Sequence, residues 1–222
     1  MMKRMVITID GPAGAGKTTV SKRLAERLSY RYVDTGALYR GVAYEAKAAG
    51  IGSDDDDALE KLCASLDLNL ALSDQGLRLI SNGVDISEKI RTPEMSMMAS
   101  AVSARKAVRA YLLGLQRKLG REKAVVFEGR DMGTVVFPEA DVKFYLDASP
   151  EIRAYRRFLE MGGDKFITLE DVEKDIRKRD ANDSSRALAP LKPAEDALII
   201  DATPLGIDAV IDTMMAHIKS KE

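Results

Sequence analysis

Eight consecutive residues near the start of the chain constrain its fold more than any other feature. Gly11 to Thr18 reads Gly-Pro-Ala-Gly-Ala-Gly-Lys-Thr, which matches the pattern G-x-x-x-x-G-K-[ST] at every fixed position. A short β-rich run, Met5 to Ile9, precedes it, and Val20, Leu24 and Leu28 follow at helical spacing. A strand, a glycine-rich turn and a helix N-terminus in this order aim backbone N–H groups at a phosphate group. The segment therefore predicts a phosphate-binding loop.

The loop also predicts which of its residues contact a nucleotide. We expect the phosphates to be bound by Gly11, Pro12, Ala13, Gly14, Ala15, Gly16, Lys17, Thr18 and Thr19. Lys17 can reach the β- and γ-phosphates and is an expected catalytic residue, and the Thr18 hydroxyl is the expected protein ligand of Mg²⁺. The motif alone does not separate a kinase from a switch GTPase, a motor or a repair ATPase. The lack of an N-K-x-D stretch and the small size of the chain favour ATP and a small acceptor.

The rest of the chain alternates between strand and helix patterns. Short runs typical of strands recur at 30–33, 124–127, 142–146 and 197–200, and helical patterns at 35–49, 102–119, 150–161, 168–179 and 207–219. This alternation predicts a doubly wound α/β fold of the P-loop NTPase type, with a five-stranded, mainly parallel sheet flanked by helices.

One region departs from that alternation. Leucines alternate along 68–72 and 77–79, and Asn82-Gly83 is a strong signal for a type I′ hairpin turn. We expect a small antiparallel sheet here, with residues 66–90 as the core of an inserted lobe. Ser53 followed by Asp56 resembles a capping box, which would place the acidic run 54–57 in the first turn of a helix.

Composition narrows the classes of function. The chain has 34 Lys and Arg against 35 Asp and Glu, so its net charge of −1 provides no general basic field for nucleic acid. Cys63 is the only cysteine, which favours a reducing compartment, and with His217 as the only histidine a multi-histidine metal site is not expected. We see no signal peptide or membrane span, and we expect a cytoplasmic protein without a membrane partner.

Arginines and aspartates stand where a second phosphate group could bind. Arg130 and Asp131 follow the predicted strand 124–127, and ligands of this fold class bind at the carboxyl ends of the strands. Transfer between two phosphate groups needs several fixed cations, and arginine binds phosphate oxygens bidentately. Two further sets of residues have the spacing that places side chains on one face of a helix. They are Arg153, Arg156 and Arg157, and Arg179, Asp183 and Arg186. For the first set, a solvated face with exchangeable salt bridges is an equal alternative.

Several separate motifs, in order, resemble one family. They are 9–12 leading into the phosphate-binding loop, 34–40 (Asp-Thr-Gly-Ala-Leu-Tyr-Arg), 129–138 (Gly-Arg-Asp-Met-Gly-Thr-Val-Val-Phe-Pro), Arg179-Asp180 with Asp183 and Arg186, and 189–191 (Ala-Pro-Leu). Over nearly its whole length the chain resembles bacterial-type cytidylate kinases. Thr35 stands where serine is expected, and the residues between Asn182 and Ser185 also depart from the family pattern.

The resemblance implies a role for each matching residue. Arg40, Arg130 and Arg186 would contact the CMP phosphate, Arg179 and Asp183 would lie towards the ribose, and Ser100, Arg109 and Asp131 would read the base. Arg153 and Arg157 would belong to a lid over ATP, so the expected catalytic set is Lys17, Arg130, Arg153, Arg157 and Arg186. Asp34 and Thr35 either bind substrate or cap the following helix, and both readings stay open.

Base chemistry agrees with this assignment. Cytosine offers an exocyclic amine that the Asp131 carboxylate can accept, whereas uracil presents an oxygen there. The expected activity is transfer of the ATP γ-phosphoryl group to CMP or dCMP in pyrimidine metabolism, with Mg²⁺, by a monomer.

We expect a core of residues 1–60 and 104–222, an insert of 61–103 that binds the monophosphate, and a lid within 151–187. The rival readings are a kinase for UMP, shikimate or dephospho-coenzyme A, and a nucleotide-dependent switch. RNA binding is disfavoured by the near-zero net charge.

Overall fold

The computed structural model describes residues 3–73, 76–161 and 168–221, and it divides into two compact units. The first unit combines Met1–Tyr32 with Glu122–Glu222, and the second is Val33–Arg121. Among the described residues, no helix has both the length and the apolar character needed to cross a membrane.

The main sheet has five strands in the order β2-β6-β1-β7-β8. They are β1 (Val6–Asp10), β2 (Arg31–Asp34), β6 (Val125–Glu128), β7 (Val142–Asp147) and β8 (Leu198–Asp201). β1 pairs in parallel with β6 and β7, and β7 pairs in parallel with β8. All five residues of β1 are buried, as expected for a central strand covered on both faces. The prediction of a mainly parallel five-stranded sheet is confirmed.

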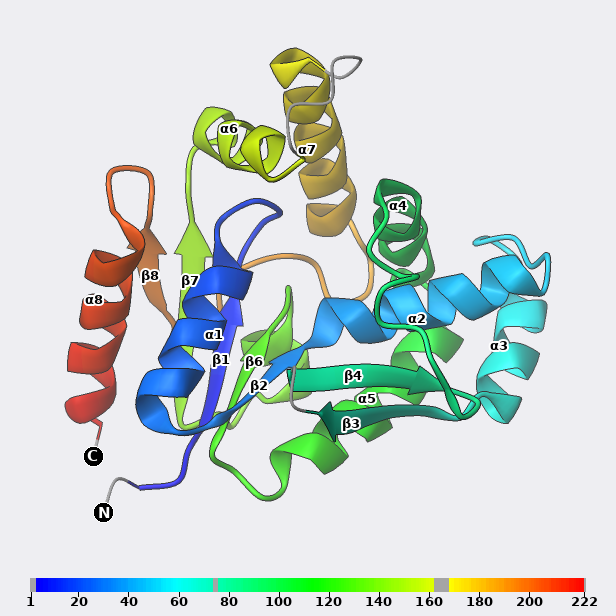
Figure 1. Ribbon diagram of the computed structural model, residues 1–222, viewed down its shortest axis with the longest axis horizontal. Coiled ribbons are helices and arrows are strands. Elements are labelled where there is room, and N and C mark those ends of the chain that lie inside the picture. The colour runs from blue at the N-terminus through cyan, green and yellow to red at the C-terminus, as the bar shows by residue number, and fades with distance from the viewer. Residues whose placement is uncertain (1–2, 74–75, 162–167, 222) are drawn as a thin grey trace. The chain divides into compact units, whose positions relative to one another are not determined.

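Helices α1 (Lys17–Leu28) and α8 (Ile207–Lys219) lie side by side along this sheet (Figure 1). Their apolar residues form one core with the sheet, including Val20 and Leu24 of α1 and Val210 and Met214 of α8. Helices α6 (Pro150–Glu160) and α7 (Leu169–Ser184) pack on each other through Ala154, Val172 and Ile176. The segment η1 (Met132–Val136) is a π-helical turn that follows β6 and that the sequence patterns did not predict.

The second unit builds its own core from helices α2 (Thr35–Ala48), α3 (Asp56–Ser65), α4 (Pro93–Val102) and α5 (Lys106–Gly120) and a three-stranded antiparallel sheet. The strands are β3 (Leu68–Ser73), β4 (Gly76–Ser81) and β5 (Val84–Asp85). Asn82 and Gly83 both have positive φ, 48° and 80°, between the paired residues Ser81 and Val84. The predicted two-residue hairpin is confirmed, whereas residues 74–75 of the preceding turn lie outside the described residues.

The second unit is larger than the predicted insert of 61–103. It begins at Val33 and ends at Arg121, because α2 and α5 share the lobe's apolar core. Leu38 and Val42 of α2 and Leu112 of α5 are fully buried in it. The apolar core of the small sheet is thus shared with α2 and α5, which lie outside 61–103.

Two local predictions were wrong. The helix expected over 102–119 is α5, which starts only at Lys106, and Val102 is the last residue of the separate helix α4. Thr92 accepts a hydrogen bond from the Met95 N–H at 3.1 Å and precedes Pro93, so the start signal of α4 was present in the sequence. The capping box at Ser53 and Asp56 is also wrong, because Asp55 is the N-cap of α3 and accepts from the Ala58 N–H at 3.0 Å.

Candidate active site

The phosphate-binding loop joins β1 to α1 as predicted. Gly11, Gly14 and Gly16 have φ values of 148°, 75° and 93°, which only glycine adopts without strain. A Cβ atom on Gly11 would lie 2.0 Å from the Leu146 carbonyl oxygen, so the loop packs against β7 with no room for a side chain. Gly16 caps α1 without a side-chain hydrogen bond, and the first turn of α1 holds no acidic residue. This helix N-terminus therefore presents its N–H groups to an anion.

Lys17 lies buried inside the loop, and its ammonium donates a hydrogen bond to the Pro12 carbonyl at 2.6 Å. Burial and then the nearby charge of Arg130 lower the pKa of Lys17 well below its usual range. Arg179 lowers the same pKa further, while Glu128 and Asp10 oppose the shift. Arg130 and Arg179 are thus both placed to act on the charge of Lys17. Such an arrangement is stabilised by a ligand that carries several negative charges.

Thr18 supplies an oxygen ligand of the kind that Mg²⁺ prefers. Its hydroxyl donates to a carboxylate oxygen of Glu128 at 2.9 Å, and Glu128 is 5% exposed at the end of β6. Within the described residues, no group of three or more His, Cys, Asp or Glu side chains is placed to hold a metal ion. Mg²⁺ is usually held by one or two protein oxygens together with substrate phosphates and water, so these residues fit it.

Arg130, Asp183 and Arg186 form one ionic cluster. The Arg130 side chain donates to one Asp183 oxygen at 3.1 Å, and Arg186 donates to the other. The Asp183 side chain is 1% exposed, so both arginines are fixed by a single buried carboxylate. The structure thus brings Arg130 of the motif 129–138 to Asp183 and Arg186 of the second motif, and Asp183 stands 53 positions from Arg130 in the sequence. Asp131, the predicted base-reading residue, is also buried, at 3% exposure.

Asp10 fixes the segment that carries Arg130 and Asp131. Its two carboxylate oxygens accept hydrogen bonds from the backbone N–H groups of Met132 at 2.9 Å and Gly133 at 2.7 Å. Burial raises the pKa of Asp10 to about 6, although these two hydrogen bonds oppose the shift. Since Asp10 directly precedes Gly11, the start of the phosphate-binding loop and the Arg130 segment are tied together through one side chain.

The arginines of α6 do not share one environment, although their spacing predicted one face. Arg153 is buried and donates to the carbonyls of Ala148 at 2.8 Å and Ala13 at 3.1 Å, and to Asp180. Arg156 donates to the Ala202 carbonyl at 2.7 Å.

Arg157 alone fits the solvated alternative, since it pairs with Glu160 at 3.1 Å and its side chain is 43% exposed. Residues 162–167 of the predicted lid lie outside the described residues.

In the second unit, Asp34 is the N-cap of α2. Its side chain accepts from the Ala37 N–H at 3.1 Å and from the Arg40 guanidinium at 2.7 Å. The capping alternative is therefore confirmed for Asp34, while Thr35 is the buried first residue of the helix. A Cβ atom on Gly36 would lie 3.0 Å from Asp34 Oδ1 and 3.2 Å from the Arg40 guanidinium, so a side chain there would crowd this ion pair. The sequence of this turn thus sets the position of Arg40.

Ser100 and Arg109 are brought together by one residue between them. The Ser103 hydroxyl donates to the Ser100 carbonyl at 2.7 Å, and the Arg109 guanidinium donates to the Ser103 carbonyl at 3.2 Å. The Arg109 guanidinium also lies over the ring of Tyr39, 5.9 Å from its centroid. The break between α4 and α5 that the sequence patterns missed is therefore the turn that joins these two predicted base-reading residues.

Sequence reasoning assigned no role to four polar residues near this site. They are Asp10, Glu128, Tyr145 and Asp180. Asp10 and Glu128 end strands β1 and β6, and an acidic residue at the carboxyl end of a parallel strand could have been singled out. Burial and then the charge of Asp147 raise the pKa of Tyr145 to about 12, so its hydroxyl stays protonated at neutral pH. No sequence pattern distinguished Tyr145 from an ordinary strand residue.

Comparison with known proteins decides the family. The family model described as cytidylate kinase matches residues 7–220. The chain belongs to the cytidylate kinase family. A cytidylate kinase of Geobacter sp. (strain M21) is 48% identical over 218 residues, which cover 98% of this chain and 94% of that protein. A cytidylate kinase of Shouchella clausii (strain KSM-K16) is 45% identical over 220 residues, covering 99% and 98%. The resemblance seen in the motifs is confirmed.

Solved structures of other kinases resemble the chain in fold alone. A shikimate kinase from Acinetobacter baumannii, solved with shikimate, has a TM-score of 0.50 and 17% identity, covering 99% of this chain and 96% of its own. A gluconokinase from Sinorhizobium meliloti 1021 has a TM-score of 0.52 and 12% identity, covering 99% and 94%. This fold, shared by kinases of different acceptors, is the one expected for a phosphate-loop kinase. The fold therefore does not identify the acceptor substrate of this chain, which has to be inferred from the residues of the site.

Proposed function

We propose that this member of the cytidylate kinase family transfers the γ-phosphoryl group of ATP to CMP or dCMP, giving ADP and CDP or dCDP. The observation that carries the proposal is the cation cluster in the first unit. Arg130 and Arg179 both act on the charge of Lys17 beside a helix N-terminus, and Arg186 joins Arg130 through Asp183. A binding protein for one nucleotide needs the loop alone, whereas the joining of two phosphate chains needs the additional arginines.

The transfer is a direct in-line displacement with no covalent enzyme intermediate. Lys17 neutralises charge on the β- and γ-phosphates of ATP, and Arg130 and Arg186 hold the acceptor phosphate. An acceptor phosphate oxygen is already a competent nucleophile near neutral pH, so the reaction needs no general base. Arg179 and Asp183 lie towards the ribose of the acceptor. Thr18 would hold Mg²⁺ together with the nucleotide, and the bound ion would supply further charge neutralisation on the transferred group.

The base is selected by Asp131, Ser100 and Arg109. A buried carboxylate accepts the exocyclic amine of cytosine, and Arg109 and Ser100 donate to its ring nitrogen and carbonyl. Uracil would leave the Asp131 carboxylate without a donor, which costs about 1–3 kcal/mol. Asp131→Asn is expected to lower the ratio of kcat/KM for CMP over UMP by about tenfold, because an amide can pair with either base. An unchanged ratio would remove Asp131 from base selection.

The parts of the chain have separate roles in this proposal. The second unit, which contains the predicted insert of 61–103, binds the monophosphate, and Arg40 on its helix α2 contacts the acceptor phosphate. The lid lies within 151–187, and Arg157 reaches ATP from it. Closure of these parts excludes water and suppresses ATP hydrolysis. The protein acts as a cytoplasmic monomer in pyrimidine metabolism.

The test is ADP release by the purified protein with Mg²⁺-ATP and a panel of acceptors. CMP and dCMP are expected to stimulate ADP release strongly, UMP weakly, and shikimate and dephospho-coenzyme A not at all. Stimulation by one of the other acceptors alone would replace CMP in the proposal. ADP release that ignores every acceptor would instead indicate a nucleotide-dependent switch.

A further inference from the structure

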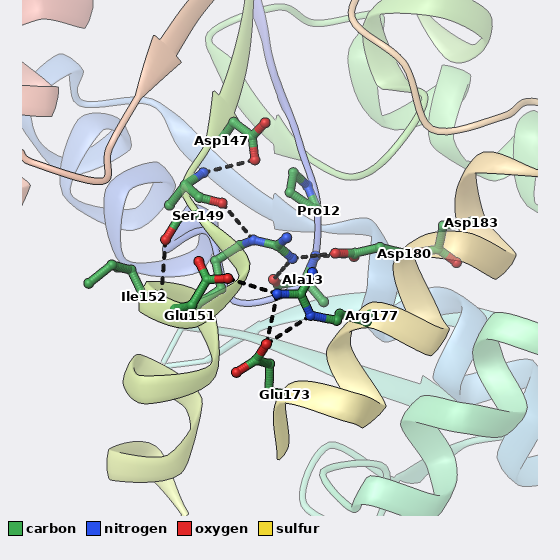
Figure 2. A network of polar contacts seen from close by, with 12 residues as sticks. Pro12, Ala13, Asp147, Ser149, Glu151, Ile152, Glu173, Arg177, Asp180 and Asp183 are labelled. Carbon is green, nitrogen blue, oxygen red and sulfur yellow. Dashed lines mark hydrogen bonds and ion pairs between the residues drawn. The ribbon is translucent and has the colours of Figure 1, made fainter. Parts of the chain in front are cut away.

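Asp180 is a polar residue of the Arg179-Asp180 motif that the proposed function leaves without a role. Both of its carboxylate oxygens are engaged in the first unit. One accepts a hydrogen bond from the backbone N–H of Ala13 at 3.3 Å, and the other accepts one from the Arg153 guanidinium. Figure 2 shows Asp180 of α7 directed towards Ala13 in the phosphate-binding loop.

Arg153 completes the contact from the other side. Its guanidinium donates to the Ala13 carbonyl at 3.1 Å and to the Ala148 carbonyl at 2.8 Å. The N–H and the carbonyl of Ala13 are therefore both bound, one by Asp180 and one by Arg153. A P-loop residue whose two backbone groups are held by side chains from α6 and α7 cannot move independently of those helices.

Close packing around Arg153 constrains the contact between Asp180, Arg153 and Ala13. The Arg153 side chain is 6% exposed, so the guanidinium needs Asp180 to balance its charge. A Cβ atom on Gly14 would lie 2.9 Å from the Arg153 carbonyl oxygen and 3.0 Å from its Cβ, so the loop rests directly on the backbone of α6. Figure 2 also shows Arg177 of α7 beside Glu151 of α6, and this ion pair of 2.7 Å holds the two helices together.

We propose that Asp180 is a positioning residue that, with Arg153, fixes the phosphate-binding loop to helix α7. Arg153 then acts on the loop and does not grip the migrating phosphoryl group, which departs from the lid role that the family resemblance implies. The proposal rests on the proposed kinase function. Its consequence follows from the position of Asp180, because the same helix carries Arg179 and Asp183. The donor loop and the acceptor-side residues are held at one fixed separation, which in-line transfer requires.

The experiment compares Asp180→Asn, Arg153→Lys and the double variant with wild type, and uses Asp175→Asn as the matched control. Asp175 is an exposed acidic residue on the same helix. Each single variant is expected to lower kcat for CMP phosphorylation about 10- to 100-fold, with a smaller change in KM for CMP. Because both act through one contact, the double variant is expected to lie within about twofold of the worse single variant. The control is expected to keep wild-type kcat.

Amide hydrogen exchange without nucleotide reports on the contact itself. Residues 11–16 are expected to exchange faster in Asp180→Asn than in wild type, while α1 and α8 exchange equally in both. If Asp180→Asn does not fold, Asp180→Glu, which keeps the negative charge beside Arg153, takes its place, with the same pattern and a smaller loss of kcat expected.

The outcomes separate this proposal from the proposed function. If wild type phosphorylates CMP but Asp180→Asn keeps wild-type kcat and exchange, the positioning role is overturned. Losses that multiply in the double variant would also overturn it, because Arg153 would then act on the substrate separately. If wild type itself ignores CMP, the kinase proposal fails, and the exchange measurement still decides whether Asp180 holds the loop.

Discussion

At the scale of single residues, carboxylates set the positions of the cations. Asp183 holds Arg130 and Arg186, Asp10 holds the turn after Arg130, and Asp180 holds Arg153. The arginines were predictable because phosphate chemistry calls for them and they lie in recognisable motifs. Their carboxylate partners were not assigned these roles, since an aspartate in a sequence is equally consistent with a solvated charge until the fold shows which groups it contacts.

Arg130 gives the sharpest single-residue prediction. Arg130→Ala is expected to lower kcat/KM for CMP about 100- to 1,000-fold, because it removes a fixed donor to the acceptor phosphate. ATP affinity, measured by titration with a non-hydrolysable analogue, is expected to stay within about twofold, since the loop and Lys17 remain. Arg121→Ala, at an exposed position, is the control. Equal losses in CMP turnover and ATP affinity would contradict the assigned role.

Asp10 gives a prediction for stability against pH. Its pKa is raised from 3.8 to about 6 in the folded protein because it is buried. Between these values the folded state binds one more proton than the unfolded state, so this group's contribution to stability is lost as pH rises through 6.

Urea unfolding should therefore show wild type losing about 2–3 kcal/mol relative to Asp10→Asn between pH 4 and pH 7. A difference between the two proteins that does not change with pH would show that Asp10 titrates normally.

At the scale of elements, predictions succeeded where one local signal was strong. The bounds of α1 and α8 follow from apolar spacing, and the Asn82-Gly83 turn from its φ requirement. Predictions of element boundaries failed where two local sequence signals competed. The alanine-rich stretch 99–110 continues a helical pattern across Ser103, and only the Ser103 and Arg109 hydrogen bonds show why the chain turns there. Four successive aspartates similarly offered several possible caps for α3.

The start of α3 is a direct test at this scale. Asp55→Ala is expected to lower the free energy of unfolding by about 1 kcal/mol, because it removes the acceptor of the Ala58 N–H. Ser53→Ala, which removes the cap favoured by the sequence pattern, is expected to have no measurable effect. Thermal unfolding of the two variants decides between the two caps, and a larger loss from Ser53→Ala would contradict the structure.

At the scale of the whole molecule, the order of motifs predicted both the fold and the family. A strand, the loop 11–18 and a helix require a parallel sheet with its ligand at the strand ends. The extent of the second unit was not predictable, because its core joins helices on both sides of the β pattern, and no composition change marks Val33 or Arg121. Contacts such as Ala13 with Asp180, 167 residues apart, also appear only once the chain is folded.

The central claim is that fixed cations let the γ-phosphoryl group of ATP pass directly to a CMP phosphate. A rapid-quench single turnover with γ-³²P-labelled ATP, CMP and Mg²⁺ tests it most directly. The label is expected to leave ATP and enter CDP at one rate, with none on the protein and little in free phosphate. Label that accumulates on the protein, or that enters free phosphate at the same rate without CMP, would contradict the account.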